Sequence, residues 1–252
     1  MQIKTKINNF HCVMPMAGDG VRFSRHGYDL PKPLIQIRKT PMFIKAAKTF
    51  PNSFKWIFIA NKKLNNKANL SNLAKNIKKK KIMLLDGKTK GQASTVHKSL
   101  KYLNNKDHII VHSCDLTFKF NLNKLKKNIN NNDVLVFTAK SSSYNKKNHT
   151  QFSWVKKINN NYKVSLKKNF KNSTNSRVLI GTFVFRNKKI MKNLLNYVFK
   201  KNIKINNEFY MDNLIYVAHK LRYKLGELIV NKYQSWGSHS ELQKYNYIKK
   251  YD

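Results

Sequence analysis

Apolar runs and amphipathic runs alternate along the first 140 residues of the chain. Each apolar run is short and apolar throughout, which is typical of strands that are buried on both faces. The runs between them carry apolar residues at helical spacing. We expect strands at Phe10–Met16, Leu34–Ile37, Trp56–Ala60, Ile82–Leu85, Ile109–Cys114 and Val134–Ala139, and helices at Pro41–Phe50, Leu64–Ile77 and Gln92–Leu103. This alternation predicts an α/β fold with a mostly parallel sheet covered by helices on both faces.

The second part of the chain has a different pattern. Three strand-like runs with a turn at Asn159–Asn161 predict an antiparallel meander, and two helices, a late strand and a last helix follow. The expected strands are Phe152–Ile158, Tyr162–Leu166, Leu179–Phe185 and Leu225–Val230, and the expected helices are Lys188–Lys200, Asn207–Arg222 and Ser238–Tyr247. We interpret the Asn- and Ser-rich segments 128–132, 141–148 and 169–176 as surface loops.

The chain contains no evident interdomain linker. We therefore expect residues 1–252 to form a single domain, with a core at 10–140 and further strands and closing helices at 141–252. Ligands of parallel sheets bind beyond the carboxyl ends of the strands. The loops after Met16, Leu85 and Cys114 are consequently the candidate site loops.

The charge of the chain is strongly positive, because 51 lysines and arginines face 11 aspartates and glutamates, a formal net charge of +40. Such a field attracts anionic substrates and polyanions, including nucleic acid. However, lysine dominates over arginine and asparagine is abundant, as drift toward A/T-rich codons would produce, and the basic residues are scattered. We favour this compositional interpretation over a dedicated nucleic-acid function. The shortage of acids makes each carboxylate more informative.

The two cysteines, Cys12 and Cys114, lie in apolar runs without metal-ligand spacing. We expect buried free thiols in a reducing compartment. No apolar run approaches the ~18 residues of a membrane span, and the first residues show no signal-peptide pattern. A cytoplasmic protein without membrane association is the expectation.

One loop contains the ingredients of an anion site. Gly18 and Gly20 allow a tight turn in which amide groups can converge on phosphate oxygens. Arg22 can add a charged donor, and Lys32 stands between two prolines whose restricted φ limits the freedom of its backbone. The spacing is also compatible with a solvated basic loop, and the phosphate-binding pattern GxxxxGK[ST] is absent.

The segment MAGDGVRFSRHGYDLPKPLIQI resembles the amino-terminal signature of the nucleotidyltransferases that make nucleotide-sugars, such as glucose-1-phosphate thymidylyltransferases. GKTKGQASTV (87–96) is similar to the base-holding loop of that family, and VHSCDL (111–116) to its strand ending in a metal-binding aspartate. The later segments FSWVKKINNNYKVSLKK, LIGTFVF, NEFYMDNLI and SWGSHSEL resemble it more loosely.

The resemblance implies a Rossmann-like GT-A type nucleotidyltransferase core with an inserted antiparallel substrate-side subdomain. It implies a reaction of a nucleoside triphosphate with a sugar 1-phosphate that gives a nucleotide-sugar and pyrophosphate, with Mg²⁺ as the cofactor. By the resemblance, four residues would surround the triphosphate: Ala17, Gly18, Asp19 and Gly20.

The resemblance also assigns roles to single residues. Arg22 would hold the departing pyrophosphate, and Lys32 would neutralise the α-phosphate or the phosphate that attacks it. Gly91 and Gln92 would contact the base, and Asp115 would hold Mg²⁺. On the acceptor side, the residues expected to bind substrate are Lys168, Gly181 and Glu208, although Gly181 is as compatible with strand packing.

Two positions depart from the family pattern. Many members carry a Glu-Lys pair on the sugar-binding strand, but here the segment 166–168 supplies only the lysine, at Lys168, and Ser235 stands where a second metal-binding aspartate would fall. Glu208 or Asp212 could take over the acidic role. These departures leave open a nucleotidyltransferase for a non-sugar phosphate, such as an alcohol or amino-alcohol phosphate. A GT-A glycosyltransferase is less favoured because no Asp-x-Asp motif follows the strand that ends at Asp115.

Overall fold

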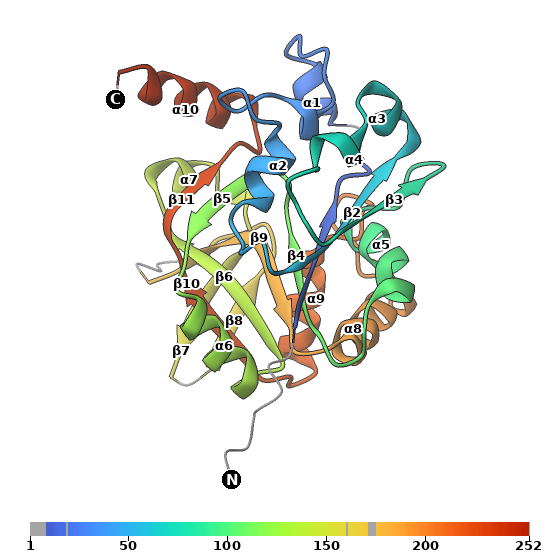
Figure 1. The fold of residues 1–252 in the computed structure, drawn as a ribbon. Coiled ribbons are helices and arrows are strands. Elements are labelled where there is room, and N and C mark those ends of the chain that lie inside the picture. The colour runs from blue at the N-terminus through green and yellow to red at the C-terminus, as the bar shows by residue number, and fades with distance from the viewer. Residues whose placement is uncertain (1–8, 19, 160, 171–174, 252) are drawn as a thin grey trace.

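The structure is a computed structural model that describes residues 9–18, 20–159, 161–170 and 175–251 (Figure 1). Within these residues nine strands form one sheet and two form another. The strands are β1 (Phe10–Pro15), β2 (Lys55–Asn61), β3 (Lys80–Leu85), β4 (His108–His112), β5 (Leu116–Lys119), β6 (Val134–Lys140), β7 (Trp154–Ile158), β8 (Asn161–Ser165), β9 (Arg177–Phe185), β10 (Leu225–Ile229) and β11 (Asn231–Ser235).

The α-helices are α1 (Val21–Ser24), α2 (Met42–Ala47), α3 (Lys62–Lys67), α4 (Leu70–Leu73), α5 (Gln92–Lys98), α6 (Leu122–Asn131), α7 (Ser143–Lys147), α8 (Lys188–Lys200), α9 (Met211–Lys220) and α10 (His239–Tyr251). Short 3-10 turns are η1 (Lys32–Leu34), η2 (Ser99–Tyr102) and η3 (His149–Gln151).

The main sheet has the order β10-β6-β9-β4-β1-β2-β3. Neighbours pair in parallel except at β9, which runs antiparallel between β4 and β6. The expected mostly parallel α/β sheet is therefore confirmed. The chain moves outward from β1 to β3 and then returns to the other side of β1 as β4, so that the connections reverse direction at the β1–β4 boundary.

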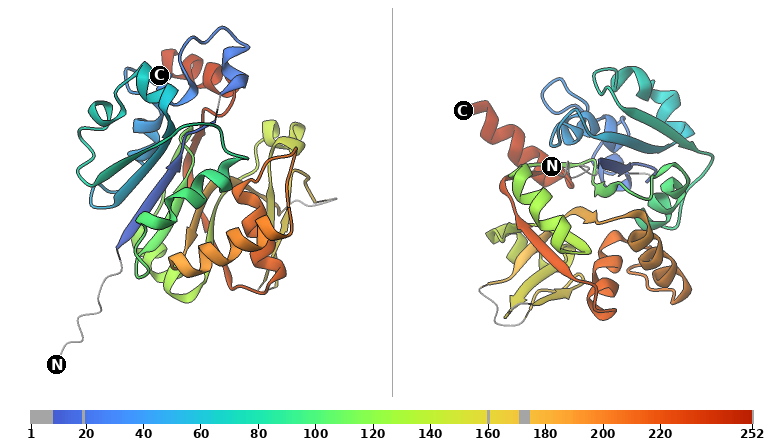
Figure 2. Two further views of the ribbon diagram at one scale, coloured as in Figure 1. Left: turned by 90° about the vertical axis from the view of Figure 1, so that its right-hand side faces the viewer. Right: turned by 60° about the horizontal axis from the view of Figure 1, so that its bottom comes forward.

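Residues of alternating parity build two separate cores on the two faces of this sheet. In β1, Phe10, Cys12 and Met14 join the core under α2, α3, α4 and α6, whereas Val13 joins the core under α5, α8 and α9. This alternation follows from the two-residue period of a strand. The two views of Figure 2 show helices on both faces of the sheet.

The antiparallel strands expected in the second part are confirmed, but their order differs from a meander, because among the described residues β8 pairs only with β7 and β9 also pairs with β7. β7 and β8 form an antiparallel hairpin, and β7 pairs with the start of β9. β9 then continues into the main sheet between β4 and β6, and β10 extends that sheet beyond β6. Strands from 141–252 thus complete the sheet that 10–140 begins.

A buried ion pair joins three of these strands. The Arg177 guanidinium on β9 donates two hydrogen bonds of 2.5 Å to the carboxylate of Glu227 on β10, and the Thr138 hydroxyl on β6 donates a third of 2.6 Å. Only 4% of the Glu227 side chain is exposed. The carboxylate is therefore fully engaged where the second part of the chain enters the sheet.

Two expected elements differ in the structure. The expected strand Leu34–Ile37 was wrong, because the prolines around Lys32 favour the turn η1, in which the Leu34 amide donates to the Pro31 carbonyl at 2.8 Å. The expected helix Leu64–Ile77 is divided into α3 and α4. Ala68 is extended, and the Asn69 side chain caps the second helix by accepting from the Asn72 amide.

Two segments interpreted as loops contain helices. Residues 128–131 belong to α6, which buries only Leu125 and Ile129 and is capped by Asn121. Residues 143–147 form α7, where Ser142 and Asn145 make a reciprocal capping box. The high asparagine content concealed both helices, since few apolar positions remain to reveal the period.

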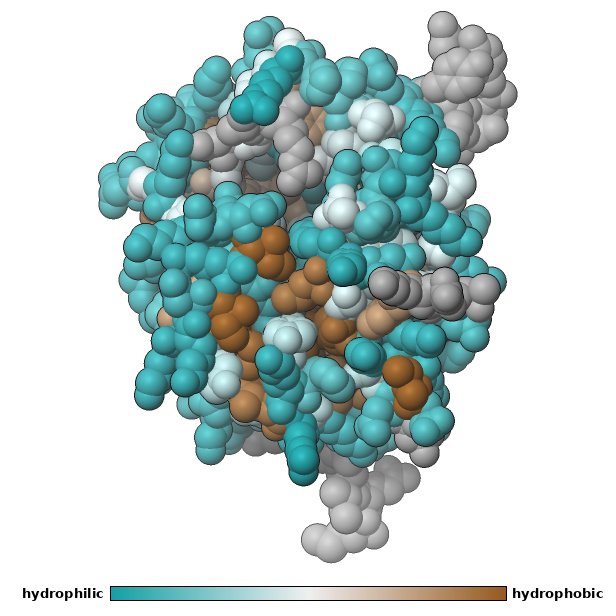
Figure 3. All heavy atoms as spheres, turned by 180° about the vertical axis from the view of Figure 1, so that it is seen from behind, coloured by the Kyte–Doolittle hydropathy of each residue, from teal (hydrophilic) through white to brown (hydrophobic). Residues whose placement is uncertain are grey.

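Hydrophilic residues cover most of the face seen from behind in Figure 3, and apolar side chains show between them mainly near its middle. None of the helices in the described residues is long and apolar enough to cross a membrane. At the end of the sheet where β1 ends, α1, α2 and α10 pack together through a third small core that includes Phe23, Met42 and Trp236 (Figure 1).

Candidate active site

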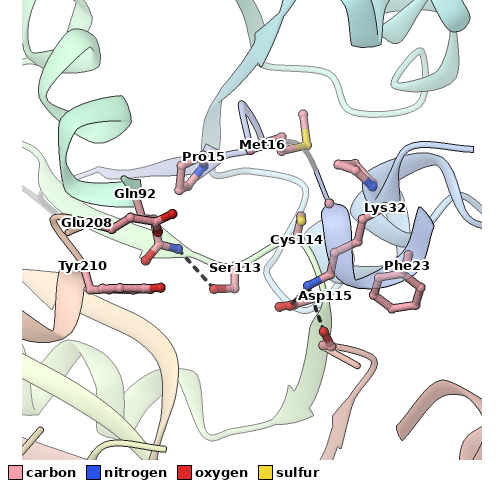
Figure 4. A pocket seen from close by; sticks show the side chains of 14 residues that line it. Pro15, Met16, Phe23, Lys32, Gln92, Ser113, Cys114, Asp115, Glu208 and Tyr210 are labelled. Atoms are coloured by element: carbon pink, nitrogen blue, oxygen red, sulfur yellow. Dashed lines mark hydrogen bonds and ion pairs between the residues drawn. The ribbon is translucent and has the colours of Figure 1, made fainter. Parts of the chain in front are cut away.

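A cavity of about 370 Å³, here called the first cavity, lies at the carboxyl ends of β1 and β4 (Figure 4). This is the position where the direction of strand connection reverses, and ligands of parallel sheets bind at such positions. Its lining is Pro15, Met16, Gly18, Gly20, Phe23, Lys32, Pro33, Gln92, Ser113, Cys114, Asp115, Glu208, Tyr210 and Gly237. Three of the predicted site loops therefore meet here.

Lys32 is held in place from several directions. It begins η1, between two prolines, and its ammonium lies 5.6 Å from the centre of the Phe23 ring. Gly20 has φ +65°, and a Cβ on it would lie 3.2 Å from the Lys32 Cβ. The glycine loop therefore packs against the stem of the lysine and directs its ammonium into the first cavity.

The Lys32 ammonium forms an ion pair with the Asp115 carboxylate and lies 3.3 Å from the Gly237 carbonyl oxygen (Figure 4). The two side chains are 19% and 20% exposed. Burial raises the pKa of Asp115, but the charge and hydrogen bond of Lys32 outweigh it, and the pKa lies below its ordinary value. The first cavity therefore holds a matched cation and carboxylate at neutral pH.

The loop before α10 closes over this pair. The Trp236 amide donates to the Asp115 carbonyl at 2.7 Å. A Cβ on Gly237 would stand 3.2 Å from Asp115 Oδ2 and 3.3 Å from Glu241 Oε2. Glu241 therefore lies beside the Asp115 carboxylate, while its own carboxylate accepts from the Ser238 amide and hydroxyl at 3.0 Å each.

Gln92 is fixed by a backbone contact between distant segments. Phe209 donates its amide to the Lys90 carbonyl at 2.9 Å, and its own carbonyl accepts from the Ala93 amide at 2.8 Å. Gly91 between them has φ +108°, and a Cβ there would lie 2.6 Å from the Phe209 nitrogen. Only glycine fits this close approach, which brings Gln92 next to Glu208 and Tyr210 (Figure 4).

Ser113 connects Gln92 to the centre of the sheet. Gln92 Nε2 donates to Ser113 Oγ at 3.3 Å. Behind Ser113, Gly181 on β9 has φ +68°, and a Cβ on it would lie 2.8 Å from the same oxygen. Gly181 thus makes room for the hydroxyl and does not itself line the first cavity.

The structure brings together six of the predicted site residues: Gly18, Gly20, Lys32, Gln92, Asp115 and Glu208 all line the first cavity. Ala17 and Gly91 are adjacent to lining residues and support the loops. Lys168 is exposed and does not line this cavity, whereas Asp212, considered as a substitute acid, accepts from the Ser153 hydroxyl at 2.5 Å. Asp19 and the side chain of Arg22 lie outside the described residues.

Several residues that line the first cavity or lie beside it were missed from the sequence. Ser113 directly precedes Cys114 and Asp115 at the end of a strand, and Tyr210 falls inside the expected helix Asn207–Arg222 although it stands just before α9 as its N-cap. Gly237 lies in the SWGS segment. Glu241 was detectable as the last residue of a Ser-x-x-Glu capping box at Ser238.

Two titratable neighbours are structural. His112 is fully buried between the Thr182 hydroxyl (2.8 Å) and the Ala46 carbonyl (3.1 Å), and burial lowers its pKa to about 4, which keeps it neutral. Cys114 is a free thiol like Cys12, and burial, followed by the Asp115 charge, raises its pKa to about 12. Neither group supplies a base or nucleophile at neutral pH.

The fold is that of nucleotidyltransferases acting on sugar phosphates and related phosphates, as the resemblance implied. The structure aligns with a nucleoside-diphosphate-sugar pyrophosphorylase from Vibrio cholerae RC9 with a TM-score of 0.78 and 17% identity over 93% of this chain and 98% of that chain. A putative glucose-1-phosphate thymidylyltransferase from Bacillus anthracis aligns with a TM-score of 0.73 and 15% identity, covering 95% of this chain and 94% of that one.

The inositol-1-phosphate CTP transferase from T. maritima is similar as well, with a TM-score of 0.68, 14% identity and 95% of both chains covered. At these identities the likeness establishes the fold. No protein-family model matches the chain, and no curated protein matches its sequence.

Proposed function

We propose that this protein is a nucleotidyltransferase that joins a nucleoside triphosphate to a phosphorylated acceptor, a sugar 1-phosphate or related phosphate, and releases pyrophosphate. The Lys32–Asp115 pair carries the proposal, because it stands in a cavity at the sheet position where ligands of this architecture bind. Proteins of the same fold include a pyrophosphorylase of nucleoside-diphosphate-sugars and an inositol-1-phosphate CTP transferase.

In the proposed reaction a phosphate oxygen of the acceptor attacks the α-phosphorus of the triphosphate. A new P–O bond forms, and the bond between the α-phosphorus and the oxygen leading to the β-phosphate breaks, so that pyrophosphate leaves with the electron pair. The nucleophile is already an oxyanion, so no proton transfer is required. Catalysis then depends on positioning and on neutralising negative charge.

The chain offers groups for both tasks. Lys32, directed into the first cavity by the glycine loop, would bind the reacting phosphates and stabilise the charge that develops between them. Gln92 would hydrogen-bond the edge of the base, since its side chain is fixed by Ser113. Arg22 would hold the pyrophosphate by the role that its motif implies. His112 and Cys114, both neutral, would take no part in the reaction.

The residues around Gly237 fit Mg²⁺, which prefers hard oxygen ligands and needs few protein ligands when phosphates and water complete its shell. The carboxylates of Asp115 and Glu241 approach one point beside Gly237. No group of three or more His, Cys, Asp or Glu side chains within the described residues could hold a metal by itself. Asp115 would therefore hold the ion together with substrate phosphates. Bound there, Mg²⁺ would neutralise phosphate charge.

The test is pyrophosphate release from purified protein with Mg²⁺, each of the nucleoside triphosphates in turn, and a panel of phosphorylated sugars, polyols and amino-alcohols. We expect release with at least one pair and a nucleotide-acceptor product of the corresponding mass. Absence of release from every pair, with protein that is folded by circular dichroism, would overturn the proposal. Release with polyol or amino-alcohol phosphates alone would assign the non-sugar class of acceptor.

A further inference from the structure

A second cavity of about 660 Å³ adjoins the first. Tyr210 lines both cavities, and Ser238, which lines the second, directly follows Gly237 of the first. Figure 4 shows Tyr210 on the side of the first cavity opposite Lys32. An acceptor whose phosphate reaches the Lys32 ammonium can therefore extend past Tyr210 into the second cavity.

The lining of the second cavity is basic, and the described residues that form it include no carboxylate. Arg25, His26, Lys167 and His239 contribute its ionisable groups besides tyrosines, and hydroxyl and amide side chains supply the rest. The first cavity, in contrast, balances Lys32 against Asp115 and Glu208. Glu241 lies behind Ser238 and is engaged in its cap, so that it does not face the second cavity.

Several of these groups are fixed before any ligand arrives. The Lys167 ammonium donates to the Gln151 carbonyl at 2.8 Å and lies 5.4 Å from the centre of the Tyr210 ring. The rings of His26 and His239 stack 4.4 Å apart at 10°. His239 Nδ1 is buried and has no hydrogen-bond partner among the described residues. A buried ring nitrogen without a partner is costly unless a ligand satisfies it.

Neutral sugar hydroxyl groups would leave these cations uncompensated. Arg25 forms no ion pair with any carboxylate of the described residues, and the Lys167 ammonium donates its hydrogen bond to a neutral carbonyl. A carboxylate or phosphate would accept charge-assisted hydrogen bonds from both and would match the local charge. The absence of a hydroxyl-binding glutamate from the segment 166–168 is consistent with that difference.

We infer that the acceptor carries a second anionic group, a carboxylate or a further phosphate, which binds in the second cavity between Arg25, Lys167 and the stacked pair His26–His239. This inference rests on the proposed function, because it names the class of acceptor used by the same site. The reacting phosphate lies at Lys32, and the second anion fixes the far end of the molecule.

The test compares three acceptors of one skeleton: glucose 1-phosphate, glucuronic acid 1-phosphate and glucose 1,6-bisphosphate. With the best nucleoside triphosphate, we expect kcat/KM to be at least about tenfold higher for one or both acceptors with the second anion, the size of one charge-assisted hydrogen bond. The glucuronic acid and bisphosphate arms distinguish a carboxylate from a phosphate. Equal kcat/KM for all three would overturn the inference.

The variants separate the second cavity from the general positive field. Arg25→Gln and Lys167→Gln should each reduce the preference for the second anion at least fivefold, whereas Lys163→Gln should retain it. Lys163 is an exposed lysine on β8 that lines neither cavity, so it matches the change in net charge. Retention of the preference in both cavity variants would overturn the inference, as would its loss in Lys163→Gln to the same extent.

A binding measurement distinguishes failure of this inference from failure of the proposed function. Calorimetric titration of the wild-type protein and the same variants with each of the three acceptors, without nucleotide, requires no turnover. Tighter binding of the doubly substituted acceptors that Arg25→Gln weakens would support the second-anion site even without pyrophosphate release. Equal binding of all three acceptors would count against it whatever the result of the activity assay.

Discussion

The two halves of the chain build their sides of the site in different ways. Residues up to 140 contribute loops that directly follow parallel strands, and these bring Lys32, Gln92 and Asp115 together by topology. Residues after 140 contribute side chains from a turn after β8, the residues before α9 and the start of α10, which meet only through tertiary packing. The first arrangement follows from a general rule of parallel sheets, whereas the second depends on individual contacts.

The difference extends to charge. The first half offers a cation paired with a carboxylate, which suits reacting phosphates and a divalent cation. The second cavity offers cations, and no carboxylate stands among the described residues that line it. In the proposed function the first cavity would therefore perform the chemistry, and the second cavity, which combines Arg25 and His26 of the first half with Lys167 and His239 of the second, would select the acceptor. Each prediction below tests this division, beginning with the largest expected effect.

Replacing Lys32 with alanine should lower pyrophosphate release by about 10²- to 10³-fold, because one preorganised charged donor to the transition state is removed. The loss should appear in kcat for every acceptor, since Lys32 stands at the reacting phosphates and not in the second cavity. Steady-state kinetics with two acceptors measures it. Lys63→Ala, at an exposed lysine on α3, is the control and should retain wild-type kcat.

Replacing Glu227 with glutamine should lower the free energy of unfolding by about 3 kcal/mol, because removing one partner leaves a buried charge without its counterion. Arg177 then lacks the carboxylate that joins β9 to β10. Urea unfolding monitored by circular dichroism measures the change. Asp86→Asn breaks the exposed pair of Asp86 with Lys62 and should alter stability by less than about 1 kcal/mol. Equal effects of both substitutions would contradict the structural role of the buried pair.

Replacing Gly91 with alanine tests the close contact between Gly91 and Phe209, which connects the two halves of the chain. A Cβ at this position would lie 2.6 Å from the Phe209 nitrogen, and the positive φ adds strain, so we expect a loss of about 1–3 kcal/mol in stability. Gly87→Ala, where a Cβ would meet nothing within 4 Å, is the matched control and should be close to wild type. Thermal unfolding of both variants measures the difference. If the Gly91→Ala protein were as stable as the control, Phe209 would have shifted away from the added methyl group without a loss of stability, which would contradict this prediction.

The fold and the first cavity were largely predictable from the sequence. The buried strands are apolar throughout, and the loops after β1, β3 and β4 carry glycine, amide and carboxylate groups at their carboxyl ends. Short-range patterns of this kind specify which residues reach one edge of the sheet. Lys32 and Asp115 could thus be placed in one site, although 83 positions separate them.

The second cavity could not be predicted, because no local pattern reports a meeting of Arg25, Lys167 and His239. The backbone of Lys167 has φ +51°, and its side chain lines the second cavity. The next residue, Lys168, is exposed to solvent. The capping role of Glu241 was detectable from the Ser-x-x-Glu pattern, but its approach to Asp115 was not, since that approach depends on the close packing at Gly237. Contacts between side chains of distant segments decide both cases.

The smallest effect should come from Gln92→Ala, which tests whether Gln92 binds the base without affecting the choice of acceptor. Loss of one neutral hydrogen bond costs about 1 kcal/mol, so we expect KM for the preferred nucleoside triphosphate to rise about fivefold, with kcat little changed, because Gln92 lies away from Lys32 (Figure 4). The variant should also discriminate less between nucleotides, and its preference among acceptors should be that of the wild type. A change in acceptor preference would contradict the division between the two cavities, since Gln92 would then act through Glu208 and Tyr210 on the acceptor side. Initial rates over a matrix of nucleotides and acceptors distinguish the two outcomes in one experiment.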